Sequence, residues 1–320
     1  MASTAAARKI VVCGGNGFLA WLDRHFHQAR LPDHLSLLSN AMPLHRPPLL
    51  PLLSLHPSPI PAAGMTRSGE PTWSSVSASA DRPPWASSVQ WHRANVLNPD
   101  EYQQHLAGAD AVVHSMGILL EADYKGVLQG KESPLSGLSR AFSASKQGSQ
   151  NPLDRKPGEE LTPQEKDGQL TYELMNRDSA ILLAKESSAH RVPTFVYISA
   201  AAGAPVLPKR YITTKREAES TIASQFPTLR SVFIRAPFMW DASRGFTLPI
   251  AAAGGVASLV NSAVGGRLTW LMGAGGVKPL KADLVGEAVV EAVEGGEAKG
   301  PVEVPEIEAL ATKHWRRNML

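Results

Sequence analysis

A tyrosine and a lysine four residues apart form the clearest pair for acid-base chemistry in this chain. Tyr211 and Lys215 belong to the run YITTK, and a spacing of four places two side chains on one face of a helix. A nearby ammonium favours the phenolate, which would lower the tyrosine pKa from its ordinary value of about 10 towards a useful range. The alternative is an ordinary pair on a helix surface.

A serine upstream of this pair completes a candidate catalytic set. Ser199 ends the apolar run VPTFVYIS, and a strand that ends there can aim its hydroxyl at the substrate oxygen that Tyr211 meets. We therefore predict three catalytic residues. Tyr211 would exchange a proton, Ser199 would polarise the oxygen, and Lys215 would lower the tyrosine pKa and bind the ribose of a nicotinamide cofactor.

A glycine-rich turn near the N-terminus is the second candidate site. It reads GGNGFLA and follows the apolar run KIVVC. Glycines allow a tight turn and bring the backbone close to a pyrophosphate at a helix N-terminus. A plain strand-to-helix turn is the alternative, but the first strand of the chain is where a dinucleotide fold needs such a turn. The predicted cofactor contacts here are Gly14, Gly15, Asn16, Gly17, Phe18 and Leu19.

Further cofactor contacts are predicted where later strands end. Arg67, with Ser68 beside it, stands where an acid would bind the ribose of NAD, and an arginine there suits the 2′-phosphate of NADP. A solvated arginine is the alternative for Arg67, and ordinary strand-end packing is the alternative for residues 95–96 and 114–117. We predict NADP, with NAD as the second possibility, and no metal. The remaining predicted contacts are Asn95, Val96, His114, Ser115, Met116, Gly117, Lys215 and Pro237.

Strands that alternate with helices must position these residues. Short apolar runs predict strands at residues 9–14, 89–96, 110–117, 192–199 and 230–237. Leu170, Leu174, Ile181 and Ala184 share one face of a predicted helix, and a second helix is predicted from Tyr211 to Phe226. The fold class is therefore α/β, a doubly wound parallel sheet of Rossmann type. We predict a nucleotide-binding domain at 1–244 and a substrate or membrane-proximal region at 245–320.

Two stretches interrupt this alternation. Residues 118–163 are polar and too long for an ordinary connection, so they are a mobile active-site loop or a disordered insertion. From Pro32 to Pro61 there are eight prolines, which cannot occupy a helix interior or a central strand. We therefore expect residues 20–64 to disrupt the first helix and the second strand, with short extended pieces near Met65 pairing at the sheet edge. Their composition also resembles translated non-coding sequence, which would make the chain a non-functional product.

Composition limits the classes of function. The chain has 320 residues, 43% of them apolar, and one cysteine, Cys13, which excludes internal disulfides and cysteine metal clusters. The net charge of +3 comes without a long basic block, so we predict no nucleic-acid partner. From Arg244 to Arg267 no charged residue lies in between, and we expect a buried or interface-lying segment there. The first residues faintly resemble a mitochondrial presequence, but the strand that begins at Ile10 leaves no room for a removable helix.

The motifs resemble the extended and atypical short-chain dehydrogenase/reductase superfamily. KIVVCGGNGFL resembles its dinucleotide turn, VVHSMG its fourth strand, YISA its serine strand, YITTK its catalytic pair and IRAPFMW its next strand end, and Asn176 resembles its helical asparagine. GGNGFL, RSGEPTW, HSMGIL, YITTKREAE and ATKHWRRNML resemble, more narrowly, a fungal mitochondrial branch linked to coenzyme Q biosynthesis. That branch is related to the nucleotide-binding accessory subunit of complex I. The likeness covers most of residues 8–19 and 66–320.

The resemblance implies an NADP- or NAD-binding protein on the matrix side of the inner mitochondrial membrane, peripheral to it and within a protein complex there. Its expected function is hydride transfer on a carbonyl or alcohol of a lipophilic substrate, with a quinone intermediate of ubiquinone biosynthesis as the candidate substrate. The alternative is a non-catalytic structural or regulatory subunit, because the nucleotide of the complex I relative is structural. One departure stands out. The family places a third glycine and an amphipathic helix where this chain has Ala20 and the proline-rich stretch.

Overall fold

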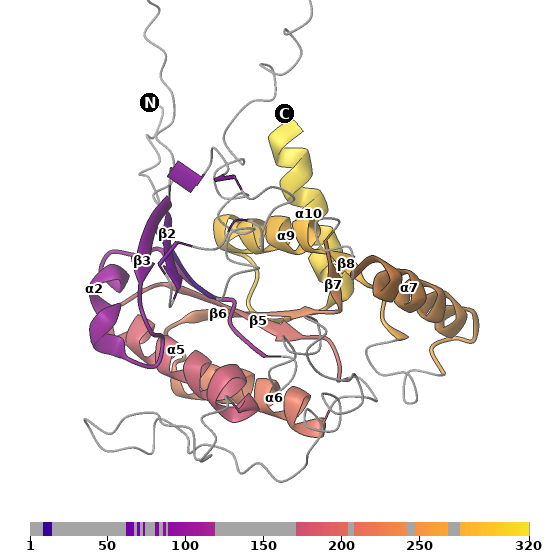
Figure 1. The fold of residues 1–320 in the computed structure, drawn as a ribbon, viewed down its shortest axis with the longest axis horizontal. Coiled ribbons are helices and arrows are strands. Elements are labelled where there is room, and N and C mark those ends of the chain that lie inside the picture. The colour runs from indigo at the N-terminus through magenta and orange to yellow at the C-terminus, as the bar shows by residue number, and fades with distance from the viewer. Residues whose placement is uncertain are drawn as a thin grey trace, which may run out of the picture.

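The structure is a computed structural model that describes residues 9–14, 62–66, 69–70, 73, 81–82, 86–87, 89–118, 171–203, 208–241, 247–267 and 276–319. Within these residues a seven-stranded parallel sheet has the order β3-β2-β1-β4-β5-β6-β9, with helices on both faces (Figure 1). The predicted doubly wound α/β fold is confirmed. The strands are β1 Ile10–Cys13, β2 Ala62–Thr66, β3 Val89–Arg93, β4 Ala111–His114, β5 Thr194–Ala200, β6 Arg230–Ala236 and β9 Gly300–Val302.

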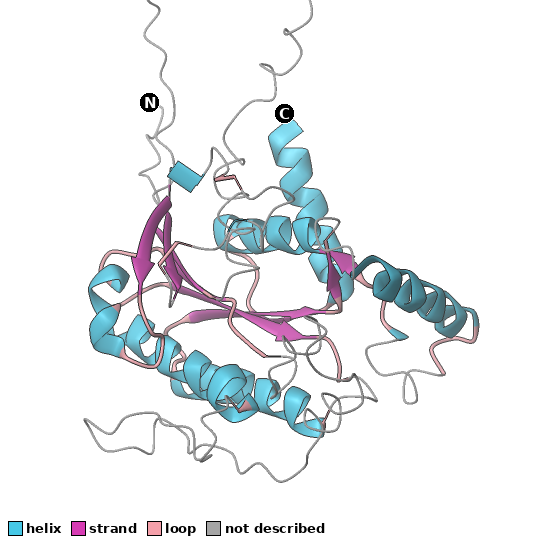
Figure 2. Ribbon diagram, in the orientation of Figure 1, coloured by secondary structure: helices cyan, strands magenta, loops and turns pink. Residues whose placement is uncertain are grey.

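Helices cover the sheet in two layers, and one helix extends away from it (Figure 2). The layer of α2, α5 and α6 lies on one face, and α9 and α10 lie on the other (Figure 1). A separate two-stranded sheet of β7 Met239–Trp240 and β8 Leu280–Lys281 lies near the base of α7. The helices are η4 Pro99–Glu101, α2 Gln103–Leu106, the π-helix η6 Glu173–Asp178, α5 Ser179–Ala189, α6 Lys209–Gln225, α7 Thr247–Ala263, α9 Ala282–Gly295 and α10 Val304–Met319.

The core consists of two apolar clusters, one on each face of the sheet. Successive strand residues point to opposite faces, so Ile10 and Val12 join the cluster under α9 and α10, whereas Val11 and Cys13 join the cluster under α5 and α6. Strands buried on both faces are continuous apolar runs, which is why β1, β5 and β6 are visible in the sequence; β1 and β6 lie within the predicted ranges, and β5 ends one residue beyond its predicted end at residue 199.

The second strand corrects one expectation. We expected residues 20–64 to disrupt it, but β2 pairs in parallel with β1, from Ile10 opposite Ala62 to Cys13 opposite Met65, and with β3 on its other side. β2 is therefore an inner strand and not an edge piece. It begins directly after Pro61, where the proline run ends, so its backbone donors are intact. The first helix, residues 15–61 and the polar stretch 119–170 lie outside the described residues.

A π-helical turn corrects the predicted helix before β5. Residues Glu173–Asp178 form a π-helix that continues into α5, and each π-turn inserts residues relative to the α-helical repeat. Leu174 therefore packs with Leu182, whereas Ile181 and Ala184 join the cluster under the sheet. The expected single face that starts at Leu170, itself outside the described residues, is wrong for Leu174.

The C-terminal part of the chain completes the sheet. β9 pairs with β6, and α9 and α10 supply apolar side chains to the core. The division at residues 244 and 245 remains a prediction, and at least residues 280–319 of the predicted second region pack on the first. Among the described helices, none combines the length and the apolar character needed to cross a bilayer.

Candidate active site

The predicted catalytic residues meet at one cavity at the carboxyl ends of the central strands. Ligands of open α/β sheets bind at this edge, where the strand order reverses. The cavity measures about 190 Å³. Seven predicted site residues and four neighbours line it, namely Ser115, Met116, Gly117, Ser199, Tyr211, Lys215 and Pro237, together with Ile118, Ile198, Ala236 and Met239.

Tyr211 and Lys215 lie on α6 as the spacing predicted. Lys215 Nζ is 5.9 Å from the centre of the Tyr211 ring and 5.1 Å from that of Tyr197. It donates a hydrogen bond of 3.1 Å to the carbonyl oxygen of Ile198. Lys215 is almost fully buried, so its ammonium is held at the end of β5, within the cavity wall.

Ion pairs hold the first turns of α6 against the π-helix. Arg210 forms a two-pronged ion pair with Glu173, and Arg177 Nη1 lies 2.9 Å from Glu217 Oε2. The ring of Tyr172 also meets that of Tyr211 edge-on, with centres 5.9 Å apart. These contacts fix the position of the Tyr211 ring relative to the helix that carries Asn176.

The electrostatics of the pair differ from the sequence-based expectation. Burial raises the pKa of Tyr211 to about 12, against a smaller lowering effect of Arg216. Burial also lowers the pKa of Lys215 to about 8, with Glu219 acting in the opposite direction. The expected lowering of the tyrosine pKa is therefore wrong for this arrangement, because desolvation of the phenolate outweighs the attraction of the neighbouring cation Arg216.

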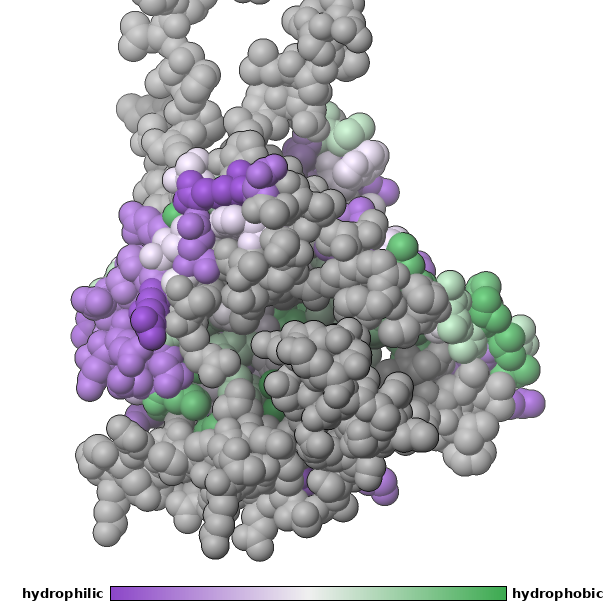
Figure 3. All heavy atoms as spheres, viewed as in Figure 1, coloured by the Kyte–Doolittle hydropathy of each residue, from purple (hydrophilic) through white to green (hydrophobic). Residues whose placement is uncertain are grey.

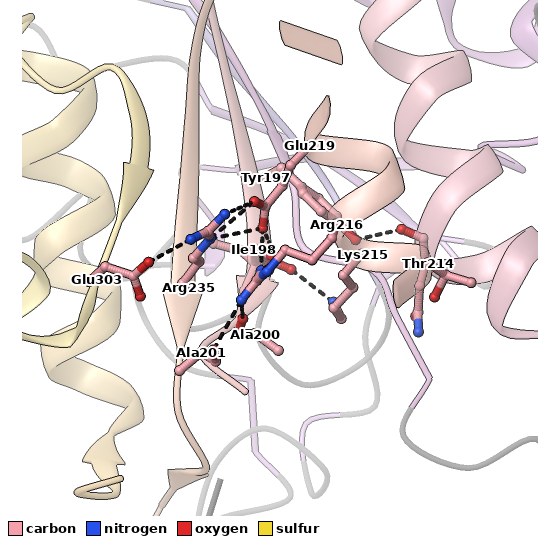
Figure 4. Close-up of polar contacts among 12 residues, drawn as sticks. Tyr197, Ile198, Ala200, Ala201, Thr214, Lys215, Arg216, Glu219, Arg235 and Glu303 are labelled. Carbon is pink, nitrogen blue, oxygen red and sulfur yellow. Dashed lines mark hydrogen bonds and ion pairs between the residues drawn. The ribbon is translucent and has the colours of Figure 1, made fainter. Parts of the chain in front are cut away.

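Ser199 lines the cavity, but its hydroxyl is engaged by a partly buried ion network. Figure 4 shows the members of this network, Arg216, Glu219, Arg235 and Glu303. Ser199 Oγ donates to Glu219 Oε1 at 2.5 Å and accepts from Arg216 Nη1 at 3.2 Å. Glu219 also accepts from Arg216 at 2.6 Å and from Arg235 at 2.5 Å, and Arg235 pairs with Glu303 at 2.6 Å. A hydroxyl has one proton to donate, so the structure directs the proton of Ser199 to Glu219.

The same network holds the chain that leaves β5. Arg216 Nη2 donates to the carbonyl oxygens of Ala200 at 2.8 Å and Ala201 at 3.0 Å (Figure 4). Glu219 is 4% exposed, and its hydrogen bonds to two guanidinium groups and one hydroxyl offset the cost of burying its charge. The two arginines and two glutamates of the network therefore fix the end of β5 relative to α6 and β6.

The end of β4 approaches both the glycine turn and the catalytic pair. Gly14 follows β1 in the sequence and lies against Ser115. A Cβ atom at residue 14 would lie 2.0 Å from Ser115 Oγ. A Cβ at Gly117 would lie 3.0 Å from Asn176 Oδ1 and 3.4 Å from Lys215 Nζ. A side chain at residue 14 would make Ser115 move, and one at residue 117 would press on Asn176 and Lys215. The predicted contacts at residues 14, 115 and 117 thus share one strand edge.

Asn176 supports this edge from the π-helix. Its side-chain Oδ1 accepts a hydrogen bond of 2.9 Å from the backbone N–H of Ile118. Its backbone carbonyl oxygen accepts a hydrogen bond of 2.5 Å from the Tyr197 hydroxyl. Asn176 is fully buried. The π-helix thus ties the chain after β4 to β5, directly behind Lys215.

Three predicted cofactor contacts have structural partners away from the cavity. His114 is fully buried, with Nε2 2.9 Å from Ser179 Oγ, and burial lowers its pKa to about 3. Asn95 Oδ1 accepts from Leu97 N at 3.2 Å, within the turn after β3, and Val96 is buried in the core. These residues do not line the cavity, and their cofactor roles remain predictions.

The other predicted cofactor contacts lie outside the described residues. They are Gly15, Asn16, Gly17, Phe18, Leu19, Arg67 and Ser68. Arg67 follows the last residue of β2 directly in the sequence, which is the position that the prediction required. The sequence reasoning missed Arg216, Glu219 and Arg235. Only the Arg216–Glu219 spacing of three could have indicated a helical ion pair.

No family model matches the chain. A curated relative, MIOREX complex component 2 of Saccharomyces cerevisiae, is 36% identical over 173 residues, which span 50% of this chain and 58% of that protein. The match therefore spans somewhat more than half the length of this relative.

Several solved structures resemble the fold at low sequence identity. WbmH of Bordetella bronchiseptica, in complex with NAD+, is 11% identical with a TM-score of 0.47, covering 92% of this chain and 74% of that one. Vestitone reductase of alfalfa is 13% identical with a TM-score of 0.45, covering 92% and 76%. These scores and identities are too low to support an inference about function.

Proposed function

We propose that this protein binds a nicotinamide dinucleotide, NADP in preference to NAD, and reduces a carbonyl group of a lipophilic substrate. One observation carries the proposal: Tyr211 and Lys215 on α6 and Gly117 after β4, which is distant from them in sequence, line one cavity at the carboxyl ends of parallel strands. That position is where a doubly wound sheet binds nucleotides. The predicted nucleotide-binding and substrate regions, 1–244 and 245–320, are part of the same proposal.

The residues at the cavity fit the nicotinamide end of such a cofactor. An ammonium has three hydrogen-bond donors, and Lys215 spends one of them on Ile198 within the described chain, so it can also bind ribose hydroxyls. The cavity of about 190 Å³ is smaller than sites for complete ligands, which measure about 300–1,000 Å³. The remainder of a dinucleotide would therefore contact residues 14–19 and 67–68, including the arginine suited to a 2′-phosphate.

The proposed reaction assigns one step to the chain. A bound reduced nicotinamide would supply the hydride for the carbonyl carbon. The Tyr211 hydroxyl would donate its proton to the carbonyl oxygen, so that an alcohol forms, and solvent would restore the tyrosine proton. Burial raises the pKa of Tyr211 to about 12, so its hydroxyl carries a proton at neutral pH, as that of an unperturbed tyrosine does. That state fits a proton donor, and we propose that the reaction runs as a reduction.

Ser199 takes part only if its hydroxyl leaves Glu219. In the role predicted from the sequence, Ser199 polarises the carbonyl oxygen by donating a hydrogen bond to it. That role requires the same hydroxyl proton that now forms the 2.5 Å hydrogen bond to Glu219. With that bond intact, Ser199 instead anchors Glu219 at the end of β5, and Tyr211 is the donor for the substrate oxygen. The Tyr211 hydroxyl has no hydrogen bond within the described part of the chain, so it is available for this task.

The cellular setting is part of the proposal. The yeast relative is a component of the MIOREX complex, which supports work within a mitochondrial protein complex. The motif resemblance further supports a peripheral position on the matrix side of the inner membrane and a quinone intermediate of ubiquinone biosynthesis as the lipophilic substrate.

A second candidate function is a non-catalytic nucleotide-binding subunit of a membrane-associated complex. The commitment of Ser199 to Glu219 favours it, because one of three predicted catalytic groups then has no part in chemistry. In this case the nucleotide would stabilise the fold without being turned over, and binding would persist without any reaction.

Cofactor oxidation separates the two candidates. The purified full chain is mixed with NADPH and extracted quinone precursors, and absorbance of the reduced cofactor is followed over time. Consumption that depends on both reactants supports the reductase. Binding without consumption supports the structural subunit, and no binding of either cofactor contradicts both.

Cofactor preference is tested at Arg67. Arg67→Asp should reverse or abolish the preference for NADPH over NADH, because the acid binds ribose hydroxyls and repels the 2′-phosphate. Arg93→Asp, at the exposed end of β3, is the matched control and should leave the preference unchanged. Equal affinities for the two cofactors in all three proteins would refute the assignment of Arg67.

A further inference from the structure

Helix α7 carries apolar side chains on the face that points away from the protein. Leu259 is 71% and Val256 63% exposed, and Leu248, Val260 and Val264 are also exposed. Steps of four and eight residues, as from Leu248 to Val256 and from Val256 to Val260 and Val264, keep these side chains on one side of a helix. We call these five residues the outer face of α7. In Figure 3 hydrophobic residues gather where Figure 1 shows this helix.

Among the residues of α7 whose side chains the structure describes, those on the inner side are small or polar. Asn261 is 5% exposed, and its amide donates a 3.3 Å hydrogen bond to the carbonyl oxygen of Gly276. Gly254 lies against Pro279, where a Cβ atom would come within 3.0 Å of the proline ring. A helix on a water-exposed surface normally has the opposite arrangement. The outer face is therefore a contact surface, because a contiguous apolar patch in water is unfavourable.

The charge around α7 is one-sided. Residues 242–282 contain Arg244, Arg267, Lys278 and Lys281 and no acid. The rest of the chain then has 28 basic and 29 acidic residues, so this segment holds the whole positive excess of the protein. Lys278 and Lys281 each pair with an acid from a neighbouring element, and such exposed pairs are weak. Arg244 and Arg267 bracket the helix in sequence, one before its first turn and one after its last.

We propose that the outer face of α7 docks onto an anionic membrane surface. The apolar side chains would enter the boundary between head groups and acyl chains, while Arg267, exposed after the last turn of the helix, would meet anionic head groups. The helix has 17 residues and does not meet the requirements for crossing the bilayer, so it lies along the surface. A protein partner fits less well, because protein interfaces concentrate aromatic residues and arginine at their centre, and the outer face has only leucine and valine.

Docking there would place the cavity near the membrane. Met239 lines the cavity and belongs to β7, which pairs with β8, and α7 starts a few residues after β7. A lipophilic substrate could then pass from the membrane to Tyr211, a consequence that rests on the proposed function. The docking itself rests only on the outer face and the charges, so each can fail without the other.

Vesicle flotation of the full chain tests the proposal. One set of vesicles contains phosphatidylcholine alone, and the other contains equal parts phosphatidylcholine and phosphatidylglycerol. The full chain should float with the anionic vesicles, and added salt should weaken the association because it screens the cations. The double variant Val256→Ser/Leu259→Ser should bind the anionic vesicles at least about tenfold more weakly, since two apolar side chains no longer enter the lipid.

Two further variants make the test specific. Arg267→Gln should weaken binding about fivefold for the one cation removed, and only to anionic vesicles. Trp315→Ser removes an exposed apolar side chain of α10, 55% exposed, and should leave vesicle binding unchanged. Circular dichroism and NADPH binding of all variants should match those of the unmodified chain, because every changed side chain is on the surface and outside the cavity.

Three results would overturn the proposal. The full chain would fail to float with anionic vesicles, or the Val256→Ser/Leu259→Ser variant would float as well as the unmodified chain. Alternatively, the unmodified chain would be a dimer by light scattering and the double variant a monomer, with no vesicle binding by either. That outcome would assign the outer face to a second copy of this chain.

Discussion

Helices α6 and α7 each have 17 residues and are arranged in opposite ways. In α6 the apolar Ala218 and Ile222 are fully buried, and the buried charges Lys215 and Glu219 have partners on β5 and β6. In α7 the buried residue among the described side chains is the polar Asn261, and the described leucines and valines are exposed. The fold of the chain therefore accounts for which side chains of α6 are buried. The exposed apolar side chains of α7 instead require a contact outside the chain.

The largest expected effect concerns the proton donor on α6. Tyr211→Phe should reduce any hydride transfer by about 10²–10⁴-fold, because it removes the general acid and keeps the ring. Cofactor affinity should change little, since Lys215 remains. Tyr102→Phe is the control, because its buried hydroxyl has no hydrogen-bond partner. Steady-state rates decide the question, and a Tyr211→Phe protein as fast as the unmodified one would remove α6 from the proposed mechanism.

Next in size is the loss of the acid at the centre of the buried network. Glu219→Gln should lower the free energy of unfolding by about 3 kcal/mol, because it leaves Arg216 without its carboxylate partner in the network and Arg235 with Glu303 alone. Glu217→Gln on the same helix removes a mostly exposed acid and should cost less than about 1 kcal/mol. Urea denaturation measures both. Equal losses would mean that the network does not distinguish α6 from an ordinary surface helix.

Replacement of the buried lysine should stabilise the protein. The pKa of Lys215 falls from 10.5 to about 8 on folding, so between these values the unfolded chain binds more protons and the free energy of unfolding rises with pH. Below pH 8 the buried charge costs its full amount. Lys215→Met should therefore raise the free energy of unfolding at neutral pH by about 1–3 kcal/mol and remove the rise above pH 8. Denaturation across this pH range checks both signs, and a destabilised variant would contradict them.

The smallest expected effect is on α7. Leu259→Ser should change the free energy of unfolding by less than about 0.5 kcal/mol, because its side chain is already in water. Ile222→Ser, the counterpart on α6, should cost several times more, since it leaves a cavity and a buried hydroxyl in the core. A large loss from Leu259→Ser would show that the outer face packs within this chain, and the contrast between the helices would disappear.

The parts of this molecule that could be predicted from sequence are those whose signals are local. The spacing of Tyr211 and Lys215 determines a shared helix face, and the apolar runs of β1, β5 and β6 identify buried strands. β2 carries only AAGMT, with no β-branched or aromatic run, so its pairing with β1 and β3 outweighs its weak propensity. β9, with the sequence GPV, is hidden for the same reason.

The contacts that could not be predicted join distant residues. Glu219 accepts a hydrogen bond from Ser199, which is 20 positions away in sequence. Arg235 donates one to Glu303, which is 68 positions away. No spacing rule connects such pairs. The raised pKa of Tyr211 likewise depends on how completely α6 and β5 bury the phenol, which is a property of packing and not of the motif. The sequence thus indicated which residues meet, but not which of them remain available for chemistry.

Cofactor binding at Lys215 is the central claim, and calorimetry tests it most directly. NADPH is titrated into the full 320-residue chain, into Lys215→Met, and into Lys209→Met, which changes an exposed lysine on the same helix. We predict binding by the unmodified chain and by Lys209→Met with the same affinity, and at least about tenfold weaker binding by Lys215→Met, because the ribose loses a charged donor. Equal affinity in all three proteins, or no binding by the unmodified chain, would contradict this account.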